Sequence, residues 1–199
     1  TAEVIRWVSP PGYRFFQTCY LISLYILGGM MRYDPHNHDR HAIRLKNHDY
    51  TEGRYFVSVC THERECLFGE IIDGEMWSNE IGRIAHKCWE EIPQHFVNVS
   101  MDEFQVMPNH LHGILTIQKP AAVGTQHVVS LPRRFQEMVP KSLSSIIRSY
   151  KAAVTRLCRN KGLHHFLWQS RFHDHIIRNS EDLDRIRLYI RNNPLNWSQ

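Results

Sequence analysis

The amino-acid sequence predicts an α+β domain in which helices pack against a mainly antiparallel sheet. Three observations lead to this prediction: short runs of β-branched and aromatic residues, amphipathic stretches that follow them, and turn residues that separate the two. A chain of 199 residues is long enough for one such domain with appended segments. Its composition is that of a globular protein, which excludes wholesale disorder.

The distribution of charge and the cysteine content limit the classes of function that fit this chain. Between residues 141 and 191 there are 11 Lys or Arg against four Asp or Glu, a local net charge of +7 (11 − 4). A nucleic-acid footprint leaves this pattern, and so does a solvated basic surface. The five cysteines include no Cys-x-x-Cys pair. This argues against a disulfide scaffold and a structural zinc ribbon, and it suits a reducing cytosol.

Residues 1–30 are expected to be an N-terminal extension, with the domain formed by residues 31–199. The apolar run at 19–27 is shorter than the roughly 20 residues that a bilayer span needs, and no small-x-small cleavage site follows it. No membrane partner is therefore expected. Residues 32–49 are rich in histidine without helical or strand periodicity, which predicts an extended arm.

The first elements are predicted from local pattern. Residues 55–60 read as a core strand, and residues 67–77 read as a hairpin whose tight turn is Asp73-Gly74. Asn79 is expected to cap a helix that continues to about Ile92, where Pro93 ends it.

The second half continues the alternation. Strands are predicted at 97–107 and 110–118 around the turn Pro108-Asn109, followed by a loop at 119–140. A long amphipathic helix is predicted at 141–158, then a loop and a short strand at 174–178. The last helix is expected to begin at Asn179 or Ser180 and to stop before Pro194.

His110 and His112 are the first candidate site residues. Because side chains alternate along a strand, both imidazoles should project from the same face. Two neutral imidazoles can hold one divalent cation if another element supplies the remaining ligand. His173 and His175 have the same spacing and stay open as a rival pair.

The last helix offers the other half of a site. Tyr189 and Asn193 are four residues apart and therefore share a face, beside the apolar stripe of Leu183, Ile186 and Ile190. An amide oxygen at Asn193 could complete a His-His-Asn metal site, with the phenol of Tyr189 nearby as a nucleophile. Tyr150 is a rival nucleophile, although its place in an apolar stripe favours packing.

Three motifs occur in the order seen in the REP-associated tyrosine transposases. They are Met-Pro-Asn-His-Leu-His-Gly at 107–113, Trp-Gln-Ser-Arg-Phe at 168–172, and Tyr-Ile-Arg-Asn-Asn-Pro at 189–194. The chain resembles this family, which belongs to the single-tyrosine, His-hydrophobic-His transposases of insertion sequences. The similarity covers residues 32–197.

The resemblance implies a ferredoxin-like fold and a Mg²⁺ or Mn²⁺ ion held by His110 and His112. A residue four positions after the tyrosine is a third ligand in relatives; here it is Asn193, where some relatives carry the longer glutamine. The resemblance further implies that Tyr189 cleaves single-stranded DNA at foldback hairpins of repeated palindromes, through a 5′-phosphotyrosine. It also implies a cytoplasmic, nucleoid-associated bacterial protein, with monomer and homodimer both left open.

Four residues are expected to contact DNA. Arg148, Lys151 and Arg171 are candidates for phosphate contacts, and Trp168 is a candidate for stacking on an unpaired base. A solvated helix face and a core tryptophan are the structural alternatives.

Two other functions stay open. One is a metal-dependent nuclease in which water attacks and the tyrosine only positions the substrate. The other is a domesticated DNA-binding regulator without enzymatic activity.

Overall fold

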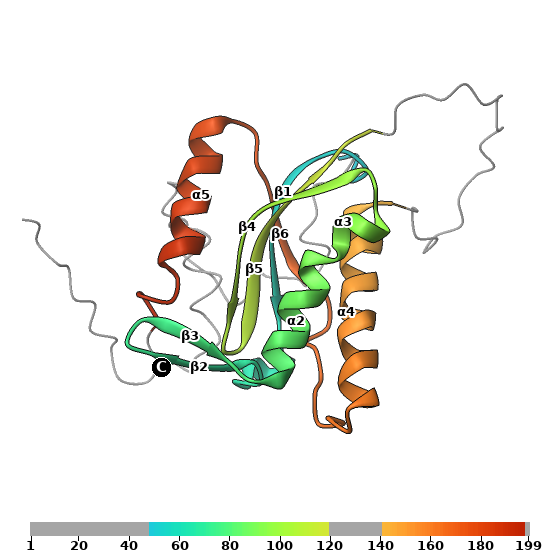
Figure 1. Cartoon of the computed structure of the whole chain (residues 1–199). Coiled ribbons are helices and arrows are strands. Elements are labelled where there is room, and N and C mark those ends of the chain that lie inside the picture. Colours follow the sequence, from blue (N-terminus) through green and yellow to red (C-terminus); the bar gives the residue numbers. More distant parts are fainter. Residues whose placement is uncertain (1–47, 120–140, 198–199) are drawn as a thin grey trace, which may run out of the picture. The chain divides into compact units, whose positions relative to one another are not determined.

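The computed structural model of the protein describes residues 48–119 and 141–197. In this part of the chain a four-stranded antiparallel sheet carries helices on both faces, and a separate two-stranded hairpin stands beside it (Figure 1). The predicted N-terminal extension, the boundary at residue 30, nearly all of the His-rich arm and nearly all of the loop at 119–140 lie outside the described residues.

The central sheet has the strand order β4-β5-β1-β6, and each strand is antiparallel to its neighbours. Its strands are β1 (Gly53–Cys60), β4 (Val99–Met107), β5 (His110–Ile117) and β6 (His173–Ile176). With a helix between β1 and β4 and another between β5 and β6, this is the ferredoxin-like arrangement. The predicted α+β class is confirmed.

The hairpin consists of β2 (Gly69–Ile72) and β3 (Glu75–Ser78). Its two turn residues both have positive φ, 52° at Asp73 and 79° at Gly74. A tight hairpin turn of this kind needs left-handed backbone at both central positions, which Asp-Gly tolerates. The hairpin prediction is confirmed.

Two helices cover one face of the sheet. They are α2 (Glu80–Glu90) and α4 (Leu143–Asn160), and their apolar stripes pack on the β1 side chains Tyr55, Val57 and Val59. The predicted cap of α2 is present, because the Asn79 side chain accepts a hydrogen bond of 2.9 Å from the Gly82 N–H.

The predicted end of α2 is wrong in detail. The helix ends at Glu90, and a short separate helix, α3 (Ile92–His95), begins where Pro93 was expected to stop helical structure. Proline is well tolerated in the first turn of a helix, because the N–H that it lacks would have no helical partner there. Pro93 therefore starts a turn of helix here.

The last helix, α5 (Ser180–Asn192), lies on the opposite face of the sheet from α2 and α4 (Figure 1). Its start is capped by the Asn179 side chain, and its apolar stripe, Leu183, Ile186 and Ile190, is buried.

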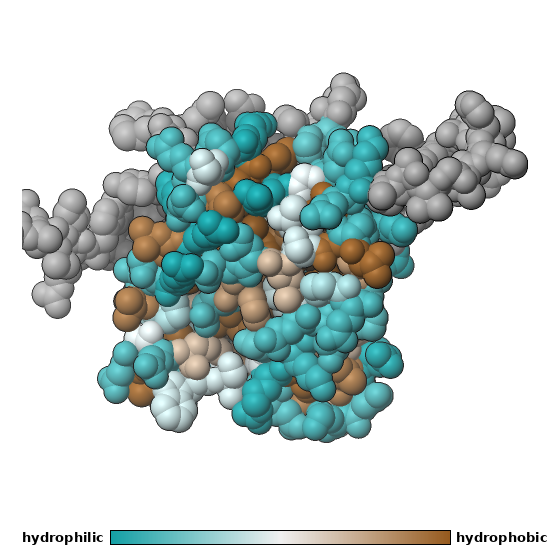
Figure 2. All heavy atoms as spheres, turned by 45° about the horizontal axis from the view of Figure 1, so that its top comes forward, coloured by the Kyte–Doolittle hydropathy of each residue, from teal (hydrophilic) through white to brown (hydrophobic). Residues whose placement is uncertain are grey.

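Hydrophilic residues cover most of the face seen in Figure 2, with apolar residues in smaller patches between them. In the described ranges, no helix combines the length and the apolar character needed to cross a membrane.

Candidate active site

His110 and His112 lie on β5, on the sheet face that α5 covers. Both side chains are buried, with 3% and 2% of their surface exposed, and their ring centroids are 4.4 Å apart. The Phe56 ring of β1 lies 5.1 Å from that of His112. The predicted placement of both imidazoles on one face of one strand is confirmed.

Only one ring nitrogen of His110 has a lone pair available to a ligand. Its Nδ1 lies 2.7 Å from Asn109 Oδ1, an atom that can only accept, so Nδ1 carries the proton. The Nε2 atom then carries a lone pair, and it is buried without a hydrogen-bond partner among the described residues. Burial lowers the pKa of His110 to about 3, with a smaller contribution from the charge of Arg64, so the ring is neutral.

His112 contacts the last helix directly. Its Nε2 is 3.1 Å from the hydroxyl oxygen of Tyr189, while its Nδ1 is buried without a partner in the described part of the chain. Burial, and then the neighbouring His110, hold the pKa of His112 well below its usual value of 6.5. Two neutral tautomers fit this contact: either the phenol donates to Nε2, or Nε2–H donates to the phenol oxygen and leaves a lone pair on Nδ1.

Tyr189 and Asn193 extend the cluster along the end of α5. The Tyr189 ring centroid lies 5.3 Å from that of His112, and the side chain is half-buried. Asn193 is the half-buried C-terminal cap residue of α5, one helical turn beyond. The Trp197 ring then lies 5.9 Å from that of His110. Asn193 therefore lies in the sequence between Tyr189, whose ring is near His112, and Trp197, whose ring is near His110.

The donor set fits a divalent metal ion. Histidines that bind metals usually donate their second N–H to a neighbouring oxygen, as His110 does to Asn109. Ser58 Oγ, opposite His112 in the β1–β5 ladder, is another buried polar atom without a partner in the described ranges. The described residues hold no cluster of three or more His, Cys, Asp or Glu side chains suited to a metal. Among the described residues, a third ligand at this pair would therefore be of another type, such as an amide.

Residues of both rival assignments make other contacts in the structure. In the rival histidine pair, His175 Nε2 lies 2.9 Å from Asp182 Oδ2 at the start of α5. The rival nucleophile Tyr150 is 3% exposed, and its hydroxyl donates to the Ala85 carbonyl at 3.2 Å. Burial raises the pKa of Tyr150 well above its usual value, which disfavours the phenolate. Tyr150 therefore serves the core, as its place in the apolar stripe suggested.

The four predicted DNA-contact residues line one groove, on the sheet face opposite to His112. The groove has a volume of about 690 Å³, and its charged lining residues are all basic: Arg148, Lys151, Arg156, Arg159 and Arg171. The Lys151 ammonium bonds the Gln169 and Arg171 carbonyls, at 2.5 and 3.0 Å, and thereby holds the loop that carries Trp168. Trp168 is half-buried and donates its indole N–H to the Lys151 carbonyl.

Sequence reasoning missed the residues that support the site. Asn109 was interpreted only as a turn residue, although its position directly before His110 on a hairpin allows its side chain to reach that ring. Phe56 was interpreted as part of a core strand, but its ring lies against His112 and Tyr189. No local signal identifies the contacts of Phe56, because they depend on which strand lies beside β5.

The chain resembles known proteins in both sequence and fold. No protein-family model matches it. Its fold resembles that of a REP-associated tyrosine transposase whose structure was solved bound to a REP hairpin. The TM-score is 0.53, with 21% identity over 79% of this chain and 76% of that one. At this identity the likeness establishes a shared fold.

A relative in sequence is a protein of Haemophilus influenzae (strain Rd), described as an uncharacterized protein. It is 39% identical over 171 residues, which cover 84% of this chain and 95% of that protein. The chain therefore belongs to the same protein family as this Haemophilus influenzae protein.

Proposed function

We propose that the protein is a metal-dependent transposase or nickase that cleaves single-stranded DNA at hairpin-forming repeats. The observation that carries this proposal is the 3.1 Å contact between the Tyr189 hydroxyl and His112, whose imidazole is buried and neutral and stands beside a second buried imidazole. A weak nucleophile is activated by an adjacent base or by a metal ion, and this contact brings the phenol to side chains that could supply either.

Tyr189 would act as the nucleophile. Its phenol oxygen attacks the phosphorus of a phosphodiester, an O–P bond forms to the tyrosine, and the bond from phosphorus to the 3′ oxygen breaks. The phenol loses its proton and the leaving 3′ oxygen gains one, which yields a 5′-phosphotyrosine and a free 3′-OH. The bond energy is kept in the protein–DNA linkage for rejoining.

His110, His112 and Asn193 would hold a Mg²⁺ or Mn²⁺ ion. When bound, such an ion polarises a phosphodiester and offsets the charge that develops on its oxygens. The residues of the chain prepare the site for it, because Asn109 fixes the tautomer of His110 and leaves the Nε2 lone pair available. In the tautomer with the proton on Nε2, His112 donates to the Tyr189 oxygen and stabilises a developing phenolate.

The basic groove beside α4 would hold the DNA backbone. Its phosphate contacts would come from Arg148 and Arg171, while Lys151 keeps the loop of Trp168 in place. Groove and active site lie on opposite faces of the sheet, and the loop before β6 links the two. Arg171 lies two residues before His173, which faces Ser58, which in turn faces His112 across the strands.

Covalent capture tests the nucleophile. Wild-type protein incubated with Mn²⁺ and a hairpin oligonucleotide carrying single-stranded flanks should form an adduct that survives a denaturing gel. Tyr189→Phe should abolish this adduct and keep hairpin binding within about twofold, because only the hydroxyl is lost.

Tyr150→Phe is the matched control. It removes a buried hydroxyl that bonds Ala85, so it should lower the free energy of unfolding by about 1 kcal/mol and leave capture intact. Capture that survives Tyr189→Phe contradicts the proposal. Cleavage without any adduct favours a nuclease that uses water, and hairpin binding without cleavage favours a regulator.

A further inference from the structure

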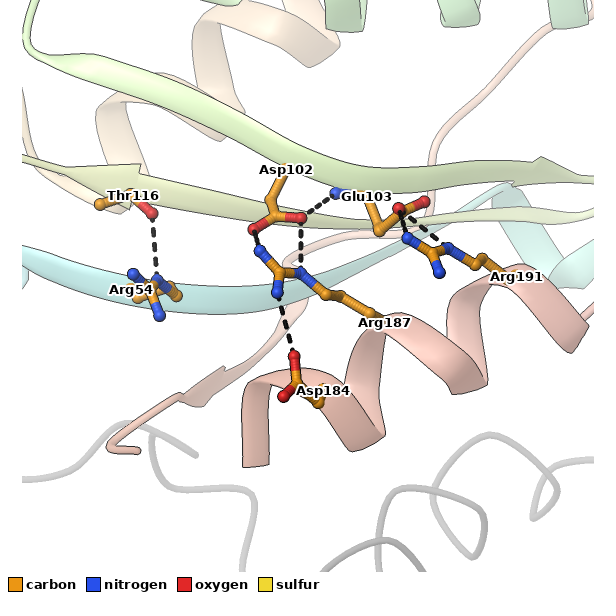
Figure 3. Close-up of polar contacts among 7 residues, drawn as sticks. All are labelled: Arg54, Asp102, Glu103, Thr116, Asp184, Arg187 and Arg191. Atoms are coloured by element: carbon orange, nitrogen blue, oxygen red, sulfur yellow. Dashed lines mark hydrogen bonds and ion pairs between the residues drawn. The ribbon is translucent and has the colours of Figure 1, made fainter. Parts of the chain in front are cut away.

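Strand β4 bulges where it passes beneath α5. Met101 pairs with Leu115 of β5 and Phe104 pairs with Gly113, so one extra residue is accommodated on β4 between the two pairs. The residues inside this irregularity are Asp102 and Glu103, two adjacent carboxylates. A bulge re-aims side chains that would otherwise alternate between faces, and Figure 3 shows both carboxylates directed at α5.

Two arginines of α5 bind these carboxylates (Figure 3). The Arg187 guanidinium contacts both oxygens of Asp102, with Nε–Oδ1 at 2.9 Å and Nη2–Oδ2 at 2.6 Å. Arg191 binds Glu103 Oε1 through Nε at 2.9 Å and through Nη2. Arg187 bonds Asp184 one turn earlier in the helix as well.

The two arginines lie close to the tyrosine in the sequence. Tyr189 lies midway between Arg187 and Arg191 in sequence, and its hydroxyl reaches His112. On the sheet, His112 pairs with Gln105, two residues beyond Glu103. The two ion pairs and the tyrosine–histidine contact therefore connect the last turns of α5 to one short stretch of the sheet.

Apolar packing alone does not determine where Tyr189 lies. Leu183, Ile186 and Ile190 hold α5 on the sheet, but apolar contacts are non-directional and tolerate small rotations and slides. Arginine–carboxylate forks are directional, because the planar guanidinium must face the carboxylate. They can define the rotation of the helix and its position along the strand.

We propose that Asp102, Glu103, Arg187 and Arg191 form a positioning clamp that sets the rotation and height of α5 and keeps the Tyr189 hydroxyl on His112. The four are positioning residues, since none contacts the reacting atoms. The clamp deepens the proposed function, and its effect on catalysis depends on Tyr189 being the nucleophile.

The charge state of the clamp supports this role. The Arg187 guanidinium, more than any other group, holds the pKa of Asp102 below its usual value, so this carboxylate is ionised at neutral pH. Both guanidinium groups are already engaged by carboxylates. They would have to break these pairs in order to bind a phosphate.

A charge swap tests the clamp. The single variants Glu103→Arg and Arg191→Glu place like charges opposite each other, and the double variant restores an ion pair of the same side-chain types in reverse. The first readout needs no enzymatic activity: the ¹⁹F NMR signal of 3-fluorotyrosine at position 189, assigned by its loss in Tyr189→Phe. Each single variant should shift this signal, and the double variant should return it towards the wild-type position.

The second readout is the rate of covalent capture. A misplaced reacting group costs up to roughly a hundredfold in rate, so we expect the single variants to lose tenfold or more in kcat with KM within about twofold. The double variant should recover most of this loss. Asp102→Asn, a milder change that keeps the shape of the side chain, should give a smaller ¹⁹F shift in the same direction.

Glu80→Arg is the matched control, because Glu80 pairs with Lys161 at 2.6 Å between α2 and α4, away from α5. It should leave the ¹⁹F signal unchanged. Single variants without a ¹⁹F shift, or a double variant that stays as shifted as the singles, overturn the clamp. The clamp is also overturned if the single variants weaken hairpin binding and the double variant does not restore it, because that result would identify direct phosphate contacts. If wild type forms no adduct, the proposed function fails while the NMR readout still decides the clamp.

Discussion

At the residue scale, the state of the two imidazoles defines the candidate site. Each ring is buried and neutral. One nitrogen of His110 contacts Asn109 Oδ1, and one nitrogen of His112 contacts the Tyr189 hydroxyl. The other nitrogen of each ring is buried without a partner in the described residues. A buried polar atom without a partner is costly to the fold, and such atoms often mark a site for a water, an ion or a ligand.

Asn109 should matter for metal binding without touching the metal. Loss of such a supporting hydrogen bond typically weakens metal affinity by about 10- to 100-fold. We therefore expect Asn109→Ala to weaken Mn²⁺ binding by this factor, and Asn109→Asp, which keeps an acceptor oxygen, to retain most of the affinity. Titration of free Mn²⁺ by its EPR signal measures both constants.

Asn98→Ala is the control for this prediction, since Asn98 bonds the Gln118 carbonyl at the other end of the β4–β5 pair. His110→Ala should remove the site altogether. Equal Mn²⁺ affinity in wild type and Asn109→Ala would show that Asn109 does not orient a metal ligand.

At the element scale, the neighbouring helices restrict which side chains β5 can carry on each of its faces. On one face it presents the histidines to α5, and on the other its Gly113 lies under the Trp89 side chain of α2. A Cβ atom at position 113 would be 2.4 Å from Trp89 Cζ2 and 2.8 Å from Cε2. Trp89 is fully buried. The glycine in the His-Leu-His-Gly motif is thus explained by packing alone.

Gly113→Ala should therefore destabilise the protein. Overpacking of a core of this kind costs about 1–3 kcal/mol, measured as a lower midpoint of urea unfolding. Trp89→Phe removes the two clashing atoms, so the double variant should be less destabilised than the sum of the two single variants. Additive losses in this double-mutant cycle would show that Trp89 is not the obstacle.

At the scale of the whole molecule, the basic C-terminal quarter divides into two sets with different surroundings. Arginines of α5 are bound by carboxylates, as in the pairs of Arg185 with Asp182 and of Arg187 with Asp102. Basic residues of α4 and of the loop before β6 line the groove on the other face of the sheet. The positive charge of this quarter is therefore divided between two faces of the sheet, and the proposed phosphate contacts lie on the face of the groove.

Salt dependence of DNA binding tests this division. Each phosphate contact on a single strand contributes roughly 0.7 to the slope of log affinity against log salt concentration. Arg148→Ala and Arg171→Ala should each lower this slope by about that amount, measured by fluorescence anisotropy with a labelled hairpin. Arg185→Ala should leave the slope unchanged, and an equal effect of all three variants would contradict a specific role for the groove.

Much of the fold was predictable because its signals are local. The Asp73-Gly74 turn, the Asn79 and Asn179 caps and the apolar stripes of α4 and α5 depend on residues a few positions apart. The same holds for His110 and His112, which share a face because side chains alternate along any strand. One exception was Pro93, where one residue type can both end a helix and begin another.

By itself, the sequence determined the α+β class, the placement of His110 and His112 on one face of a strand, the last helix with Tyr189, and the concentration of positive charge near the C-terminus. Only the tertiary structure decided that Tyr189 reaches His112 while Tyr150 is committed to the core. It alone paired the α5 arginines with the β4 bulge, and it assigned the groove arginines to the opposite face. The reason is that these contacts join residues 65 to 88 positions apart. They depend on strand order and helix placement, which no local pattern records.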